Sequence, residues 1–358
     1  MGSILSHILK RRDSMNQMMG DGSLCFSKTP FIISTASVVG KKEGEGPLKH
    51  CFDVIGSDEM FGEENWEAAE SALQKEALTL TLAKINRKSE DVRYLFAGDL
   101  LGQTIASSFG LKEFEIPLFG LYGACSTCGE SLSLAAMNVA AGYADCVAAV
   151  TSSHFASAEK QFRFPLEYAN QRPKSATWTV TGGGAFLLVS EEKMAEWNIK
   201  PIAKITGVTT GKIVDYGVKD SMNMGAAMAP AACDLIYRHF EDFTRTAKDY
   251  DRIVTGDLGT IGSEILVDLL KEKGYDISEV HEDCGVKIYD GEKQGTGAGG
   301  SGCGCSAVTL SGHYLKELKE GRMHRILFVP TGALLSTVSF NEGQSVPGIA
   351  HGVVIERV

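Results

Sequence analysis

The stretch that decides the fold is Gly120–Ala136, GLYGACSTCGESLSLAA. Its glycines and Ala124 allow a sharp, crowded turn, and the apolar residues from Leu132 onward recur at helical spacing. Cys125 therefore stands where a turn passes into a helix. Free backbone N–H groups and the helix dipole favour a thiolate there, so Cys125 is a candidate nucleophile. The alternative is a structural cysteine, because free cysteines are among the most buried residues.

The composition is ordinary for a globular protein. Of 358 residues, 44% are hydrophobic and 22% are charged, close to the average for globular domains. The formal net charge of −10 argues against general nucleic-acid binding. No apolar run reaches the about 18 residues that a membrane-spanning helix needs. The nine cysteines lack both paired extracellular spacing and nearby well-spaced histidines, so we predict a reducing environment and no metal or cofactor site.

Residues 1–22 are predicted to lie outside the fold as a disordered tail or leader. The apolar residues of 4–9 could share a helix face ahead of Lys10-Arg11-Arg12. Such a segment would also suit an anionic membrane surface, which is the alternative interpretation.

The order of elements in the first half of the chain recurs in the second. In each half a short strand ends in Gly-Asp-Leu, at Gly98–Leu100 and Gly256–Leu258. A helix-like segment, a glycine turn and two more strands follow. The predicted strands are Val92–Phe96, Cys146–Thr151 and Gly182–Val189 in the first half, and Arg252–Val254, Arg325–Pro330 and Ala350–Ile355 in the second.

Strands that alternate with helices indicate βαβ units with right-handed crossovers. We therefore predict an α/β fold of two similar halves, residues 23–195 and 196–358, joined by a solvated crossover at Ser190–Pro201. Pockets in such sheets open beyond the carboxyl ends of the strands, where both glycine turns would lie. Backbone N–H groups of Gly300, Ser301 and Gly302 could cradle an anion there, although glycines needed only for tight packing are the alternative.

Duplicated βαβ halves with a cysteine at the first helix start resemble the thiolase fold of thiolases and ketoacyl synthases. The resemblance implies two βαβαβαββ halves packed as α-β-α-β-α layers, with Cys125 in the nucleophile position. In that superfamily the cysteine attacks a thioester, and histidines or an asparagine activate the carbon nucleophile. The corresponding windows here, Thr255–Thr260 and Gly299–Cys305, contain neither residue type. The negative charge of Asp257 would also oppose formation of a thiolate at Cys125. The sequence therefore predicts that the condensing chemistry of the superfamily is lost.

A closer resemblance runs from about Lys28 to Val358. Its segments, in order, are Leu95–Gly102, Gly123–Thr127, Thr151–His154, Ala158–Arg163, Met224–Ala232, Ala298–Cys303, Thr331–Ser336 and Ile349–Val354. They resemble the stage V sporulation protein AD family of spore-forming bacteria, which is without established condensing activity.

This family resemblance implies binding of dipicolinic acid, free or with calcium, for uptake into the developing spore and release in germination. It implies a soluble protein of the forespore and spore, peripherally associated with the spore inner membrane, where it works with other stage V sporulation A-operon proteins. Thiolase-fold proteins generally form homodimers through the edge strand of the first half, which we place near Cys146–Thr151. The competing hypothesis is an acyltransferase or condensing enzyme that uses Cys125.

Dipicolinate is a flat ring with two carboxylates, so its pocket needs donors and a flat wall. Arg163 and Arg172 are the main candidates, because a guanidinium can hold a carboxylate through two parallel bonds. The other candidates are His154 and His351, Ser126 and Thr127 after the cysteine, and Asp257 at a strand end. For the two histidines the alternative is a core residue bonded to backbone, and for Ser126 and Thr127 it is a hydroxyl that caps the helix. Asp257 and Asp99 could bind calcium, and the alternative for them is that each caps the turn that follows its strand.

Overall fold

The computed structural model describes residues 17–163 and 171–358, so residues 1–16 of the predicted tail lie outside it. Within the described part, β1 (Met18–Met19) pairs with β2 (Ser23–Cys25), and β2 pairs in turn with β10 (Ala203–Thr210). The Ser23 hydroxyl donates to the Asp242 carboxylate at 2.7 Å. The N-terminal hairpin is thus attached to the second half of the chain.

The main strands form two sets with the same internal order. The first set is β3 (Phe31–Val39), β5 (Tyr94–Gly98), β6 (Leu118–Leu121), β7 (Cys146–Ser153) and β9 (Gly182–Val189). The second is β10, β11 (Arg252–Thr255), β12 (His281–Asp283), β14 (Arg325–Val329) and β16 (Gly348–Glu356). The spatial orders are β6-β5-β7-β9-β3 and β12-β11-β14-β16-β10, joined where β3 meets β10. In each set the first and fourth strands run antiparallel to the fifth, which lies between them, as expected for a duplicated unit.

One detail of the sequence interpretation is wrong. The strand at Cys146–Thr151 was expected at the edge of the first half, but β7 is paired on both sides, with β5 and β9. The edge strand is β6, which pairs only with β5. The error arises because strand order in a crossover sheet does not follow chain order.

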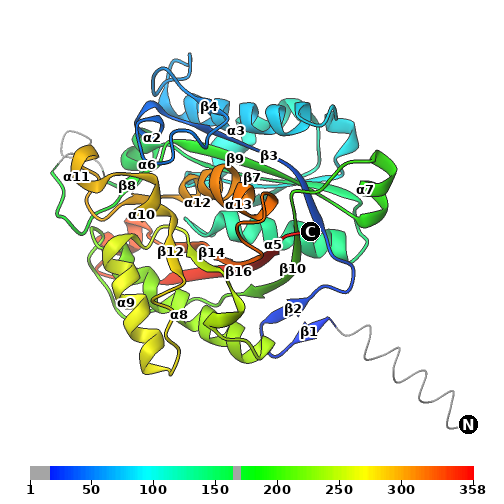
Figure 1. Cartoon of the computed structure of the whole chain (residues 1–358). Helices are drawn as coiled ribbons and strands as arrows, with labels where there is room; N and C mark the ends of the chain where they lie inside the picture. Colours follow the sequence, from blue (N-terminus) through cyan, green and yellow to red (C-terminus); the bar gives the residue numbers. More distant parts are fainter. Residues whose placement is uncertain (1–16, 164–170) are drawn as a thin grey trace, which may run out of the picture.

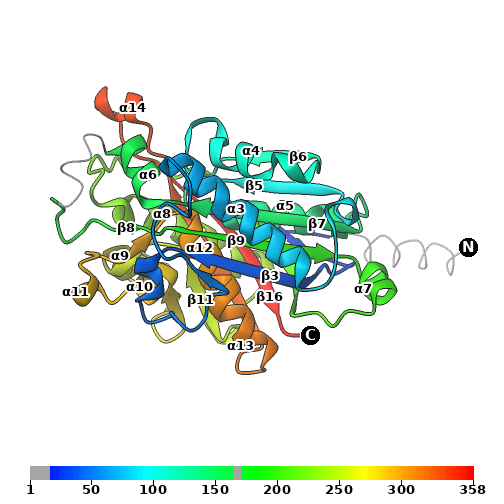
Figure 2. The same ribbon diagram turned by 90° about the horizontal axis from the view of Figure 1, so that it is seen from above.

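Helices complete five layers (Figures 1 and 2). The outer helices are α3 (Trp66–Ala83) and α4 (Ile105–Leu111) over the first set of strands, and α8 (Met224–Phe243) and α9 (Gly259–Glu272) over the second. Between the sets lie α5 (Thr127–Ala140) and α12 (Cys303–Thr309). Helix α5 contacts β7 and β16, so it packs against both sheets. Because β3, β7 and β9 are covered on both faces, every residue in them is buried.

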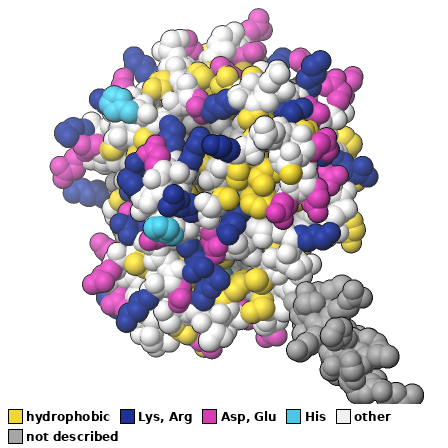
Figure 3. All heavy atoms as spheres, turned by 45° about the vertical axis from the view of Figure 1, so that its right-hand side comes forward, with side chains coloured by type: hydrophobic (Ala, Val, Ile, Leu, Met, Phe, Trp, Pro, Cys, Tyr) yellow, Lys and Arg dark blue, Asp and Glu magenta, His cyan; other side chains and the backbone are white. Residues whose placement is uncertain are grey.

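Shorter elements connect this framework. They are α2 (Lys41–Gly44), β4 (Val54–Ile55), α6 (Phe155–Phe162), β8 (Trp178–Thr179), α7 (Glu191–Trp197), α10 (Cys284–Ile288), α11 (Gly291–Gln294), β13 (Gly300–Ser301), α13 (Leu315–Lys319), β15 (Thr331–Ala333) and α14 (Thr337–Asn341). On the face shown in Figure 3, basic and acidic side chains are interspersed around a smaller hydrophobic patch.

A buried carboxyl of the first half is hydrogen-bonded to a residue of the second half. Glu43 of α2 is 1% exposed. Its Oε1 accepts from the backbone N–H of Thr181 at 3.0 Å and from the hydroxyl of Tyr289 in the second half. Burial raises the pKa of Glu43 to about 7, and nearby Glu59 adds to the shift. The neutral form is therefore favoured in the folded protein.

Replacing Glu43 by Gln should flatten the pH dependence of stability. In the unfolded chain Glu43 titrates near 4.5, while its pKa in the folded protein is about 7. The folded state therefore holds a proton that the unfolded state has released, and this contribution, present below pH 4.5, is lost as pH rises to about 7. Between these two pH values the free energy of unfolding of wild type, measured with urea, should fall by on the order of 3 kcal/mol relative to that of Glu43→Gln. Parallel pH profiles would contradict the assignment.

Candidate functional site

Cys125 lies in a locked turn between β6 and α5. Ala124, the preceding residue, has a φ of 50°, a left-handed conformation that a non-glycine residue adopts only where its surroundings hold it. The Thr127 hydroxyl accepts from the N–H of Gly123 at 3.0 Å and donates to the carbonyl of Ala124 at 2.7 Å. The Ser126 hydroxyl donates to the carbonyl of Gly123 at 2.6 Å. Both hydroxyls hold the turn by bonds to its backbone, and neither caps α5 by accepting from an N–H group of the helix. Neither residue lines the adjacent cavity.

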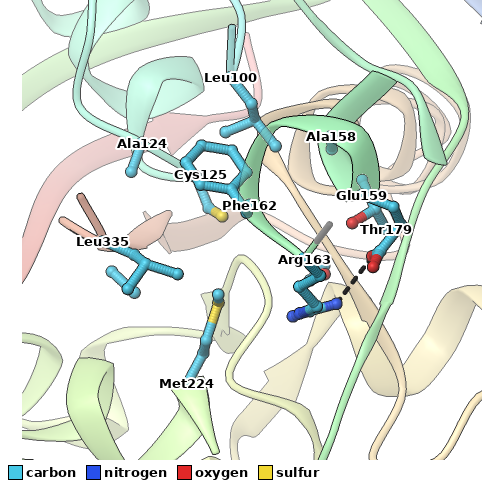
Figure 4. A pocket seen from close by; sticks show the side chains of 12 residues that line it. Leu100, Ala124, Cys125, Ala158, Glu159, Phe162, Arg163, Thr179, Met224 and Leu335 are labelled. Atoms are coloured by element: carbon cyan, nitrogen blue, oxygen red, sulfur yellow. Dashed lines mark hydrogen bonds and ion pairs between the residues drawn. The ribbon is translucent and has the colours of Figure 1, made fainter. Parts of the chain in front are cut away.

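A small cavity opens in front of Cys125. It is lined by Leu100, Ala124, Cys125, Ala158, Glu159, Phe162, Arg163, Thr179, Met224, Ser301, Ala333 and Leu335. Figure 4 shows the Phe162 ring close to the Cys125 sulfur, with Met224 and Leu335 on the other sides. The lining comes from both halves and is mostly apolar, with one charged wall at Glu159 and Arg163.

The carboxylate of Asp257 lies next to Cys125. Asp257 follows β11 and is fully buried. Its Oδ2 accepts from the N–H of Gly302 at 2.9 Å and its Oδ1 from the Thr331 hydroxyl at 3.0 Å. Burial raises its pKa to about 7, although a hydrogen bond from Cys125 opposes the shift. Asp257 thus joins the cysteine turn to two elements of the second half.

This environment keeps Cys125 protonated. Burial first, and then the charge and hydrogen bond of Asp257, raise the pKa of the Cys125 thiol well above its ordinary value. The N–H of Gly302 and the charge of Arg163 act in the other direction but weigh less. The thiolate expected from the helix start is therefore disfavoured, because loss of hydration outweighs the helix dipole.

The glycine turn at Gly300–Gly302 packs against the Cys125 turn, and its backbone is largely used by contacts within the protein. Gly302 has a φ of 98°, and a Cβ there would lie 2.6 Å from the Ser153 hydroxyl, so only glycine fits. Its N–H is already donated to Asp257. Gly300 and Ser301 form β13, which pairs with β8, and of the three residues only Ser301 lines the cavity.

Arg163 and Arg172 converge on one carboxylate. Arg163 caps the C-terminal end of α6, and its Nη1 lies 2.7 Å from Oε1 of Glu159. Arg172 places its Nη2 2.6 Å from the same oxygen and donates from Nη1 to the Thr177 carbonyl. Arg163 lines the cavity, while Arg172 lies behind it over the stacked rings of Phe155 and Trp178.

Neither predicted histidine lines the cavity. His154 caps α6: its Nδ1 accepts from the N–H of Ala156 at 3.2 Å, and its Nε2 bonds the Glu59 carbonyl at 2.7 Å. His351 is buried in β16, where burial lowers its pKa to about 4. Asp99 accepts from the N–H groups of Leu101 and Ser107, so it caps a turn. The core and capping alternatives hold for these residues.

Sequence reasoning missed several lining residues. Leu100, Met224 and Leu335 carry no chemical signal, because apolar residues from distant elements line a cavity only after folding. Phe162, an aromatic residue among the basic residues of its stretch, does carry one, and it lines the cavity. Glu159 did carry a signal, since it lies four residues before Arg163 on a helix and such pairs interact. Among the described residues, no group of three or more His, Cys, Asp or Glu side chains is placed to hold a metal ion. No helix in residues 17–163 and 171–358 is both long and apolar enough to span a membrane.

The sequence of this chain is shared with a known protein family. Residues 20–356 match the family model described as stage V sporulation protein AD. The chain belongs to this family. It is 43% identical over 341 residues to stage V sporulation protein AD of Bacillus subtilis (strain 168), covering 95% of this chain and 98% of that protein. The chain is therefore a sporulation protein, as the family resemblance predicted.

Two solved structures of similar fold are of a thiolase. Human mitochondrial 3-ketoacyl-CoA thiolase in complex with CoA superposes with a TM-score of 0.57 at 14% identity, covering 92% of this chain and 98% of that one. A second structure of the human mitochondrial 3-ketoacyl-CoA thiolase superposes with a TM-score of 0.56 at 13% identity. At this identity the likeness concerns the fold alone, and it confirms the predicted thiolase-like fold.

Replacing Asp257 by Asn should make Cys125 more reactive. The amide keeps an oxygen for the Gly302 N–H but removes the negative charge that opposes the thiolate. We expect alkylation of Cys125 by iodoacetamide at pH 8 to speed up on the order of tenfold, the effect of about one pKa unit. Peptide mass spectrometry measures the rate, with exposed Cys25 as the internal reference. An unchanged Cys125 rate would show that Asp257 does not control the thiol.

Proposed function

We propose that this protein binds dipicolinic acid, free or as its calcium chelate, in the cavity beside Cys125. The observation that carries the proposal is the make-up of this cavity, an apolar space with a buried guanidinium at one wall. A flat ring suits the side chains of Phe162 and Leu335, and a ring carboxyl suits Arg163. Membership of a sporulation family supports a ligand of the spore.

In this proposal the protein serves uptake of dipicolinic acid into the developing spore and its release in germination. It acts in the forespore and spore, peripherally associated with the inner membrane, with other stage V sporulation A-operon proteins as partners. These steps deepen the sporulation role that the family membership gives.

We further propose that the site binds without condensing activity. No histidine or asparagine is found among the described residues that line the cavity. A condensing enzyme needs such a group to polarise the second thioester and to move a proton. The protonated state of the Cys125 thiol supports the same conclusion. The alternative, an acyltransferase that uses Cys125, would need surroundings that lower the pKa of the Cys125 thiol.

The ranking of two substitutions tests the binding site. Cys125→Ala removes a thiol that contributes shape and one weak contact, so affinity for dipicolinate should fall by on the order of 1 kcal/mol. Arg163→Ala removes a charge-assisted bond and should cost roughly 1.5–3 kcal/mol. Titration calorimetry, with and without calcium, measures both values.

Lys160→Ala is the matched control, because Lys160 lies on the same helix but pairs outward with Glu67. It should leave the affinity unchanged. The reverse ranking, with Cys125→Ala abolishing function and Arg163→Ala silent, would mean that the ligand is misplaced. A covalent acyl adduct on Cys125 with turnover, seen by mass spectrometry after incubation with acyl-thioesters, would establish the alternative function.

We also propose a homodimer that pairs through β6, the corrected edge strand. The exposed fractions of Leu118 and Phe119 in β6, and of Tyr122 directly after it, are 41%, 50% and 46%. Apolar side chains along an open strand edge favour pairing with another chain.

Leu118→Glu should therefore convert the dimer to a monomer, since it places a charge in the proposed contact. Val286→Glu, at an exposed apolar position of α10 in the second half, is the control and should leave the dimer intact. Light scattering at micromolar concentration gives the mass. A monomeric wild type would remove the proposal.

A further inference from the structure

The carboxylate of Glu159 is shared between two guanidinium groups. Its Oε1 lies 2.7 Å from Arg163 and 2.6 Å from Arg172. The three side chains are 1%, 12% and 10% exposed, respectively. In this arrangement Glu159 already occupies the position against Arg163 where a ligand carboxylate would be expected to bind.

Two polar atoms of this pair are left without a hydrogen bond. Oε2 of Glu159, an acceptor, and Nε of Arg163, a donor, are both buried and have no partner among the described residues. Both residues line the cavity, and Figure 4 shows their side chains together at one wall. Buried polar atoms are almost always satisfied in folded proteins, so an unmet donor and acceptor at a cavity wall indicate the polarity of the missing group.

The charges around this wall are balanced by other contacts. On α3, Glu67 is paired with Lys160, and Glu70 accepts from Ser152 and Ser157. His154 at the start of α6 is bonded to backbone, and β8 contributes no titratable side chain. Across the cavity, Cys125 is protonated and the pKa of Asp257 is raised to about 7 by burial. Within residues 17–163 and 171–358, the charges that face an incoming group are therefore those of Glu159 and the two arginines.

We propose that the ligand's carboxyl binds at this wall with uptake of one proton. Its carbonyl oxygen accepts from Nε–H of Arg163, and its O–H shares the added proton with Oε2 of Glu159. A bare carboxylate could accept from Arg163, and the two guanidinium groups leave a net positive charge at this wall. It has no hydrogen to donate to Oε2 of Glu159, however, and would set two carboxylate oxygens against each other. The group that fits both atoms is a neutral carboxylic acid or a primary carboxamide. This inference rests on the proposed function and adds its proton linkage.

Proton uptake makes affinity depend on pH. Where the free ligand is a carboxylate, each unit of pH decrease should tighten binding about tenfold, because one proton enters with the ligand. Rising pH should then favour release. The monoamide of dipicolinic acid carries the donor and acceptor permanently, so its binding through the amide should not depend on pH in this way.

Calorimetry counts the protons directly. Dipicolinate is titrated into wild type at pH 7 to 8 in buffers of different ionisation enthalpy, and we expect an uptake of one proton. Glu159→Gln keeps an oxygen for both arginines and offers an N–H to the ligand, so it should bind dipicolinate with no uptake and at least about tenfold more tightly at pH 8. Glu67→Gln, the matched control outside the cavity, should behave as wild type.

The outcomes separate this inference from the proposed function. Binding of dipicolinate by wild type without proton uptake overturns the inference and leaves the function standing. Binding of the monoamide but not of dipicolinate, weakened in Glu159→Gln, overturns the function and supports the inference. Binding of neither probe overturns both. If Glu159→Gln lowers the melting temperature, the proton count is repeated in Asp257→Asn, because Asp257 has a pKa of about 7 and could also take up a proton at pH 7 to 8. Loss of the uptake in Asp257→Asn would overturn the inference.

Discussion

The buried carboxyl of Asp257 is the contact on which the site depends. It accepts from the Gly302 N–H and the Thr331 hydroxyl and bonds the Cys125 thiol. Three chain segments that are remote in sequence therefore meet at one side chain. An unpaired carboxylate in this position would be costly, so these donors both satisfy it and hold the two glycine turns together.

The same carboxyl determines what kind of chemistry the cavity can support. A thiol beside a buried acid, with a raised pKa, is a poor nucleophile. The thiolase-like fold thus places a cysteine at the start of the central helix, while the local electrostatics oppose its activation. A fold shared with enzymes does not by itself establish their chemistry in this chain.

The opposite wall gives the cavity its selectivity. Two guanidinium groups and one carboxylate are packed against apolar side chains, where electrostatic interactions are weakly screened. Glu159 neutralises one of the two positive charges within the fold, and in the proposed binding mode the ligand meets this wall with a group that has both a donor and an acceptor. The apolar remainder of the cavity favours a flat, uncharged body for the same molecule.

The sequence by itself determined the duplicated α/β fold, since strand periodicity, Gly-Asp-Leu strand ends and glycine turns are local signals that occur twice. It also identified Cys125, Arg163 and Asp257, which carry distinctive chemistry. Only the tertiary structure decided that β6 is the edge strand and that His154 and His351 lie outside the cavity. The apolar lining and the sharing of Glu159 between two arginines likewise emerged only on folding. The reason is physical: strand order, burial and the pairing of charges depend on contacts between distant segments, and no local pattern encodes them.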